Sequence, residues 1–68
     1  MIIIYYRYYN KKEARWKDAE MTFNLLGKAL RFIYSFKNKD NRYLDGYVCY
    51  DRFYESSIEY AFRQMSIF

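Results

Sequence analysis

The chain opens with eight residues, Ile2 to Tyr9, that are almost all isoleucine or tyrosine. β-Branched and aromatic side chains suit the pleated surface of a sheet, so this segment is expected to form a strand. Successive side chains of a strand point to opposite faces. One face then carries Ile2, Ile4, Tyr6 and Tyr8, and the other carries Ile3, Tyr5, Arg7 and Tyr9. Both faces are apolar or amphipathic, which predicts a central strand covered on at least one side.

From Glu13 to about Lys37, apolar residues recur at spacings of three and four, which predicts one long amphipathic helix. The main stripe of this helix comprises Trp16, Ala19, Phe23, Leu26, Leu30 and Ile33. A second row beside it comprises Leu25, Ala29, Phe32 and Phe36. The apolar arc is wider than one small sheet is expected to cover. We therefore expect a homodimer, formed through the second row or through a strand edge.

After a turn at residues 38–41, the pair Asp45-Gly46 favours the tight turn of a β-hairpin. This predicts a short hairpin that joins Arg42–Leu44 to Tyr47–Tyr50. The alternative is a single strand over Tyr47–Tyr50 after a plain loop.

The last segment fits two structures. A helix from Arg52 would have Asp51 as its N-cap and would pair Glu59 with Arg63 one turn later. A strand from Ser57 would alternate apolar and polar residues. Helix propensity favours the helix. With no linker or repeat in its 68 residues, the chain is expected to form a single small α+β domain over residues 1–68.

The inventory of reactive side chains is thin. The chain has no His, a single Cys at position 49 and irregularly spaced acids, and its two glycines form no phosphate-binding loop. These absences disfavour the common zinc sites, an internal disulfide and general acid–base catalysis. We therefore expect no enzyme activity, no cofactor and no metal site.

Cations and aromatic rings are interleaved near the N-terminus. The chain has a formal charge of +4, yet its first 17 residues already reach about +5, counting the amino group. The candidate partner-binding residues are Tyr6, Arg7, Tyr8, Tyr9, Lys11, Lys12, Arg15, Trp16 and Arg52. This mixture is typical of a protein-binding hot spot, or of a nucleic-acid surface at residues 5–17. The rest of the chain is nearly neutral, whereas a nucleic-acid binder usually spreads its charge over a whole face. We therefore favour a protein partner.

Composition also bears on origin. Residues with AT-rich codons number 35 of 68, which indicates an AT-rich bacterial, phage or mobile-element genome. Together with the small size, this predicts a phage or mobile-element accessory protein that inhibits or modulates a host machine such as a defence nuclease. The apolar run at the N-terminus has four residues, too few for a signal peptide or a membrane span. With a single thiol, the chain is expected to be cytoplasmic.

Overall fold

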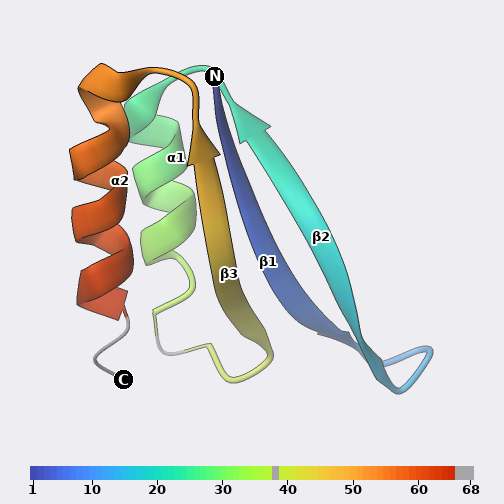
Figure 1. The fold of residues 1–68 in the computed structure, drawn as a ribbon. Helices are drawn as coiled ribbons and strands as arrows, with labels where there is room; N and C mark the ends of the chain where they lie inside the picture. Colours follow the sequence, from blue (N-terminus) through green and yellow to red (C-terminus); the bar gives the residue numbers. More distant parts are fainter. Residues whose placement is uncertain (38, 66–68) are drawn as a thin grey trace.

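The computed structural model describes residues 1–37 and 39–65. Its elements are β1 (Ile2–Asn10), β2 (Arg15–Phe23), α1 (Leu26–Tyr34), β3 (Arg42–Cys49) and α2 (Arg52–Met65). The strands form one antiparallel sheet in the order β2-β1-β3, and both helices lie on the same side of it (Figure 1). The predicted small α+β class is confirmed, although the order of elements differs at two places.

The strand predicted at the N-terminus is confirmed as β1, and it is the central strand. Ile2 pairs with Phe23 of β2 on one side and with Cys49 of β3 on the other. Ile2 and Ile4 are buried at 2% and 0% exposure, so the even-numbered face of β1 is the one covered by the helices. This face carries the isoleucines that gain most from burial.

The long helix predicted from Glu13 is wrong over its first half, because residues Arg15–Phe23 form β2. Their sequence fits two periods at once. Trp16, Ala19 and Phe23 have helical spacing, while Ala19, Met21 and Phe23 alternate with polar residues as in a strand. Without β2 the sheet would have two strands, which is marginal in water. Pairing with β1 along nine residues therefore overrides local helix propensity.

The hairpin predicted at Asp45-Gly46 is wrong, whereas the alternative of a single strand is confirmed, although the strand starts at Arg42 rather than at Tyr47. Residues Arg42–Cys49 form one strand that pairs with β1 along its length. The register shifts opposite Tyr5 and Tyr6, where Asp45 is the extra residue of a β-bulge. Because β1 provides partners for both halves of β3, the Asp-Gly pair is absorbed as a bulge rather than used as a turn.

The C-terminal helix is confirmed, and the strand alternative is wrong. The Asp51 carboxylate accepts a hydrogen bond from the backbone N–H of Phe53 at 3.0 Å, as expected of an N-cap. The predicted pair forms between Arg63 Nη2 and Glu59 Oε1 at 2.7 Å. Residues 66–68, at the end of the predicted segment, lie outside the described residues.

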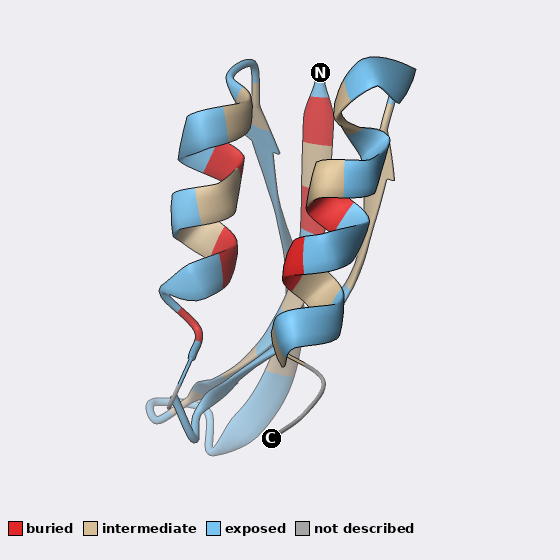
Figure 2. Ribbon diagram, turned by 90° about the vertical axis from the view of Figure 1, so that its left-hand side faces the viewer, coloured by how far each residue is buried: buried red, intermediate tan, exposed pale blue. Residues whose placement is uncertain are grey.

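The core lies between the helices and the first half of β1 (Figure 2). Its buried residues are Ile2, Ile4, Ala29, Ile33, Ile58 and Ala61. Beside them, the Tyr6 ring lies 5.3 Å from the rings of both Phe32 and Phe36, measured between centroids. Aromatic side chains thus fill the space between β1 and the end of α1, as expected of a chain with few leucines and valines.

The row proposed as an oligomer interface belongs largely to this core. Ala29 and Phe36 are buried at 0% and 4% exposure, and Phe32 packs against Tyr6. Only Leu25, at the start of α1, is exposed. Part of the apolar arc expected for one helix belongs to β2, and most of the rest packs within the chain. Of this row, Leu25 alone presents an exposed side chain to a second copy.

Candidate functional site

The face of the sheet opposite the helices is not covered by any described element (Figure 1), and we call it the open face. Strand registers place the odd-numbered residues of β1 on it, together with the cross-strand partners of those residues. It carries Ile3, Tyr5, Arg7 and Tyr9 of β1, Trp16, Asp18, Glu20 and Thr22 of β2, and Tyr43, Gly46 and Val48 of β3.

Three rings, one from each strand, meet on the open face, and we call them the aromatic cluster: Tyr9, Trp16 and Tyr43. The Trp16 ring lies 5.5 Å from Tyr9 and 5.3 Å from Tyr43, between centroids. Register causes this meeting, because Tyr9 pairs with Trp16 and the neighbouring Arg7 pairs with Tyr43. Trp16 remains 43% exposed and Tyr43 54% exposed. The cluster is therefore preformed and still offers a large aromatic area to a partner.

A charged pair adjoins the aromatic cluster. Arg7 donates from Nε to the carboxylate of Asp18 on the neighbouring strand, at 3.2 Å. Both side chains are more than half exposed, so the pair adds little to stability. Glu20 follows on the same face of β2 and has no ion pair with any described residue. Tyr5, Asp18, Ala19 and Glu20 line a shallow hollow there, so this half of the open face is polar and carries both signs of charge.

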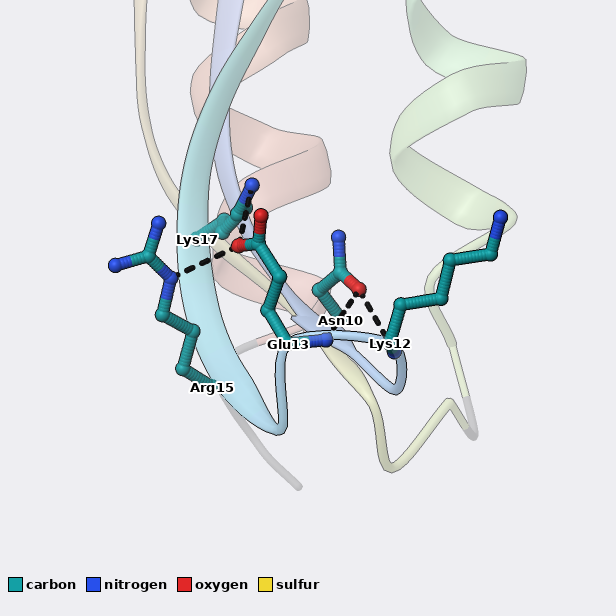
Figure 3. A network of polar contacts seen from close by, with 5 residues as sticks. All are labelled: Asn10, Lys12, Glu13, Arg15 and Lys17. Atoms are coloured by element: carbon teal, nitrogen blue, oxygen red, sulfur yellow. Dashed lines mark hydrogen bonds and ion pairs between the residues drawn. The ribbon is translucent and has the colours of Figure 1, made fainter.

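The turn between β1 and β2 is held by its own side chains (Figure 3). The side-chain oxygen of Asn10 accepts hydrogen bonds from the backbone N–H groups of Lys12 at 2.9 Å and Glu13 at 3.2 Å. The Glu13 carboxylate contacts Lys17 Nζ at 2.6 Å and Arg15 Nε at 2.9 Å. The hydrogen bond from Lys17, followed by that from Arg15, lowers the pKa of Glu13, and the same contact raises the pKa of Lys17. Both groups are therefore charged at neutral pH.

The residues just before β3 reach the same end of the sheet, because the backbone N–H of Tyr9 donates to the carbonyl of Asn41 at 3.0 Å. We call the shared end the basic tip. It comprises the cations Lys11, Lys12, Arg15, Lys17, Lys39 and Arg42 and the acids Glu13 and Asp40. Its formal charge of +4 equals that of the whole chain, so the positive and negative charges of the remaining residues cancel. The fold thus gathers at one end a charge that the sequence divides between two segments.

The opposite end of the molecule exposes apolar side chains, and we call it the apolar end. It comprises Met1, Leu25, Tyr50 and Phe53, the last of which is 83% exposed. These residues lie where β1 and both helices begin and where β3 ends (Figure 1). The backbone N–H of Tyr50 donates to the Met1 carbonyl at 3.1 Å, which ties two of them together.

The predicted partner-binding residues are divided among four places. Arg7, Tyr9 and Trp16 share the open face, whereas Tyr6 and Tyr8 are half-buried on the helix side. The turn residues Lys11 and Lys12 belong to the basic tip with Arg15, and Arg52 begins α2 at the other end. Tyr6 and Tyr8 are therefore not presented with Arg7, Tyr9 and Trp16 to a single partner.

Sequence reasoning missed three residues near these surfaces: Tyr43, Lys39 and Arg42. They come from the segment after α1, which lies more than 20 positions from Trp16 in the chain. Their only signal is cross-strand register, and it becomes readable once β3 is known to pair antiparallel with β1.

Within residues 1–37 and 39–65, no group of three or more His, Cys, Asp and Glu side chains is placed to hold a metal ion. Over the same residues, no helix is long and apolar enough to cross a membrane. The Cys49 thiol is half-buried and donates to the Asp51 carbonyl, with Sγ 3.0 Å from the oxygen. Comparison of the chain with protein-family models, with curated proteins and with solved structures finds no match.

Proposed function

We propose that this chain is a small, non-enzymatic protein-binding module that contacts its partner through the open face. The observation that carries the proposal is the aromatic cluster, in which Trp16 joins Tyr9 and Tyr43 on an uncovered sheet face beside Arg7. Trp, Tyr and Arg are the residue types that most often dominate binding energy at protein interfaces.

Folding alone does not account for the aromatic cluster. The core on the other side of the sheet is formed by isoleucines, alanines and phenylalanines, and includes none of the three rings. A partner that covered the cluster would remove its remaining apolar surface from water, at about 25 cal/mol per Å². Around it, Arg7, Asp18 and Glu20 provide charges of both signs, which resembles the polar rim of an interface.

We further propose that this chain is encoded by a phage or mobile element and that its partner is a protein of the host cell, such as a defence nuclease. The chain would inhibit this partner by covering its functional surface. Support comes from the short length and the AT-rich codon composition. On this proposal the chain needs no catalytic group, because occlusion alone blocks the partner.

The test compares proteins that co-purify with three tagged forms of the chain in a bacterial host. The forms are the natural sequence, a face variant with Trp16→Gln and Tyr43→Ser, and a control with Tyr50→Ser and Phe53→Gln at the apolar end. Loss of two central rings is expected to weaken binding by more than 2 kcal/mol, about 30-fold. A protein retained by the natural form and the control but lost by the face variant supports the proposal. Equal retention by the face variant contradicts it.

A further inference from the structure

We infer that the basic tip binds the phosphate backbone of nucleic acid, independently of base sequence. This site goes beyond the protein-binding function proposed for the open face, because it uses different residues and a different chemistry. It also differs from the surface at residues 5–17 expected from the sequence, since it includes Lys39 and Arg42 and excludes the rings of the aromatic cluster.

The positive charge of the chain is concentrated at the basic tip. Six cations and two acids at the basic tip carry the entire formal excess of the chain, while the rest of the molecule has as many acids as cations. Concentrated charge of one sign raises the local concentration of oppositely charged ligands and speeds their association. A polyanion is therefore drawn to this end rather than to the molecule as a whole.

The cations of the basic tip differ in whether they already contact a carboxylate or a ring. Glu13 is shared between Arg15 and Lys17, and the Arg42 guanidinium lies 5.8 Å from the centroid of the Phe36 ring. Among the described residues, Lys11, Lys12 and Lys39 form no ion pair, and all three are exposed. Figure 3 shows the Lys12 side chain extending away from the Glu13 carboxylate. These three ammonium groups can therefore contact phosphates without breaking an existing pair.

Hydrogen bonds hold both segments of the basic tip in place. Asn10 holds the backbone of the β1–β2 turn through two hydrogen bonds, and the Tyr9–Asn41 hydrogen bond fixes the residue before β3 next to the end of β1. Lys11 and Lys12 in the turn and Lys39 ahead of β3 lie at the same end of the sheet and can thus engage separate phosphates. Side-chain contacts to phosphate position a protein on nucleic acid but read no bases. We therefore expect little sequence preference.

Acidic side chains on the open face confine the phosphate site to the basic tip and the helix side of the sheet. Asp18 and Glu20 on the open face repel phosphate, and Asp18 already engages Arg7. Arg15, Lys17 and Arg42 pair with Asn10 or Tyr8, so they lie on the helix side of the sheet, away from the aromatic cluster. Phosphates would then follow the tip and the helix side, and the open face stays available to a protein.

The primary experiment is a fluorescence anisotropy titration of a labelled 20-nucleotide single strand and a 20-base-pair duplex at several salt concentrations. If Lys11, Lys12 and Lys39 neutralise about three phosphates, the slope of log K against log salt is expected to be about −2.1 for the single strand and about −2.7 for the duplex. Affinity then falls about 20- to 40-fold between about 50 and 200 mM salt. Absence of binding to both oligonucleotides at 50 mM salt would overturn the inference.

Matched variants locate the site. Lys11→Ala with Lys12→Ala is expected to reduce the steepness of the slope by about 1.4 to 1.8, because two phosphate contacts are lost. Lys28→Ala with Arg52→Ala removes the same charge from the other end and should leave the slope within about 0.5 of the natural value. Equal effects of the two pairs would show non-specific attraction and overturn the assignment.

Two further arms separate the possible ligands and the two proposals. Polyglutamate of the same charge is expected to bind more weakly than the duplex, and binding of equal strength would instead indicate an acidic polypeptide as the ligand. The face variant with Trp16→Gln and Tyr43→Ser should retain the full salt slope. If this variant loses nucleic-acid binding, the nucleic-acid site is the open face and the assignment to the basic tip is overturned. If no protein partner is found in the co-purification, only the function proposed for the open face fails, because nucleic-acid binding by the basic tip is measured separately.

Discussion

The two ends of the molecule are built on different principles. Around the apolar end, β1 and both helices begin next to the buried residues Ile2, Ile4 and Ala29, so packing holds this half together. The basic tip projects beyond the helices, and its residues are almost all exposed (Figures 1 and 2). Backbone hydrogen bonds donated to the Asn10 side chain and ion pairs to Glu13 hold it instead.

Because of this difference, one end of the molecule provides stability and the other can carry binding residues. Elements with few buried contacts open at low free energy and tolerate substitution. The basic tip can therefore carry its excess of positive charge without weakening the core, while the core residues cannot be changed without cost. Substitutions at each end of the molecule test this difference.

The largest expected effect is that of Ile4→Ala at the core. The Ile4 side chain is completely buried, and removing it should lower the free energy of unfolding by about 3 kcal/mol, the sum of lost burial and a residual cavity. Urea denaturation followed by circular dichroism measures the change. Lys11→Ala at the basic tip is the control, with an expected change within about 0.5 kcal/mol. A similar loss for both variants would mean that the tip is part of the cooperative core.

Replacing a glycine by alanine in α1 and an alanine by glycine in the tip turn should raise the free energy of unfolding by similar amounts. Gly27 lies in α1, and a Cβ built there meets no heavy atom within 4 Å, so Gly27→Ala should raise stability by about 1 kcal/mol. Ala14 has a positive φ of 52° in the tip turn, which is unfavourable for a side chain, so Ala14→Gly should gain about 1 kcal/mol. Thermal unfolding of each single variant and of the pair checks both values. A loss of stability in Ala14→Gly would contradict the left-handed conformation at this turn.

The smallest expected effect is a pH dependence confined to the tip. The pKa of Glu13 is lowered in the folded chain, chiefly by the hydrogen bond from Lys17. Its contribution to stability is therefore present above the unfolded pKa and is lost as the pH falls through the folded pKa. NMR titration of the Glu13 side chain and of nearby amides should show a midpoint below that of an unfolded reference peptide. In Glu13→Gln the tip amides should lose this transition, and a midpoint at or above the reference would contradict the two ion pairs.

Local sequence is enough to predict an element where only one kind of secondary structure fits its pattern of apolar and polar residues. The Ile/Tyr run of β1 has no helical period, and the segment from Asp51 has both an N-cap and an ion pair that requires helical spacing. Residues Arg15–Phe23 satisfy both periods, so only the presence of β1 as a partner decides them. The Asp45-Gly46 pair is decided in the same way.

The candidate surfaces were harder to predict than the elements. Arg7, Tyr9 and Trp16 could be named from the cluster of rings and cations near the N-terminus. Their separation from Tyr6 and Tyr8 required knowing which face the helices cover, and Tyr43 and Lys39 required the pairing of β3 with β1. These contacts are long-range, and composition alone does not encode them.

The acids of β2 have a consequence for self-association. β2 is an edge strand of nine residues, which leaves a row of backbone groups open to strand addition. If two copies paired antiparallel along β2 over seven or more residues with matching faces, Asp18 or Glu20 of one copy would lie opposite an acid of the other. Like charges directly opposite destabilise a strand pair. The edge is thereby protected against a dimer of this kind and against aggregation of identical chains, while a strand that places lysine or arginine opposite these acids meets no such barrier.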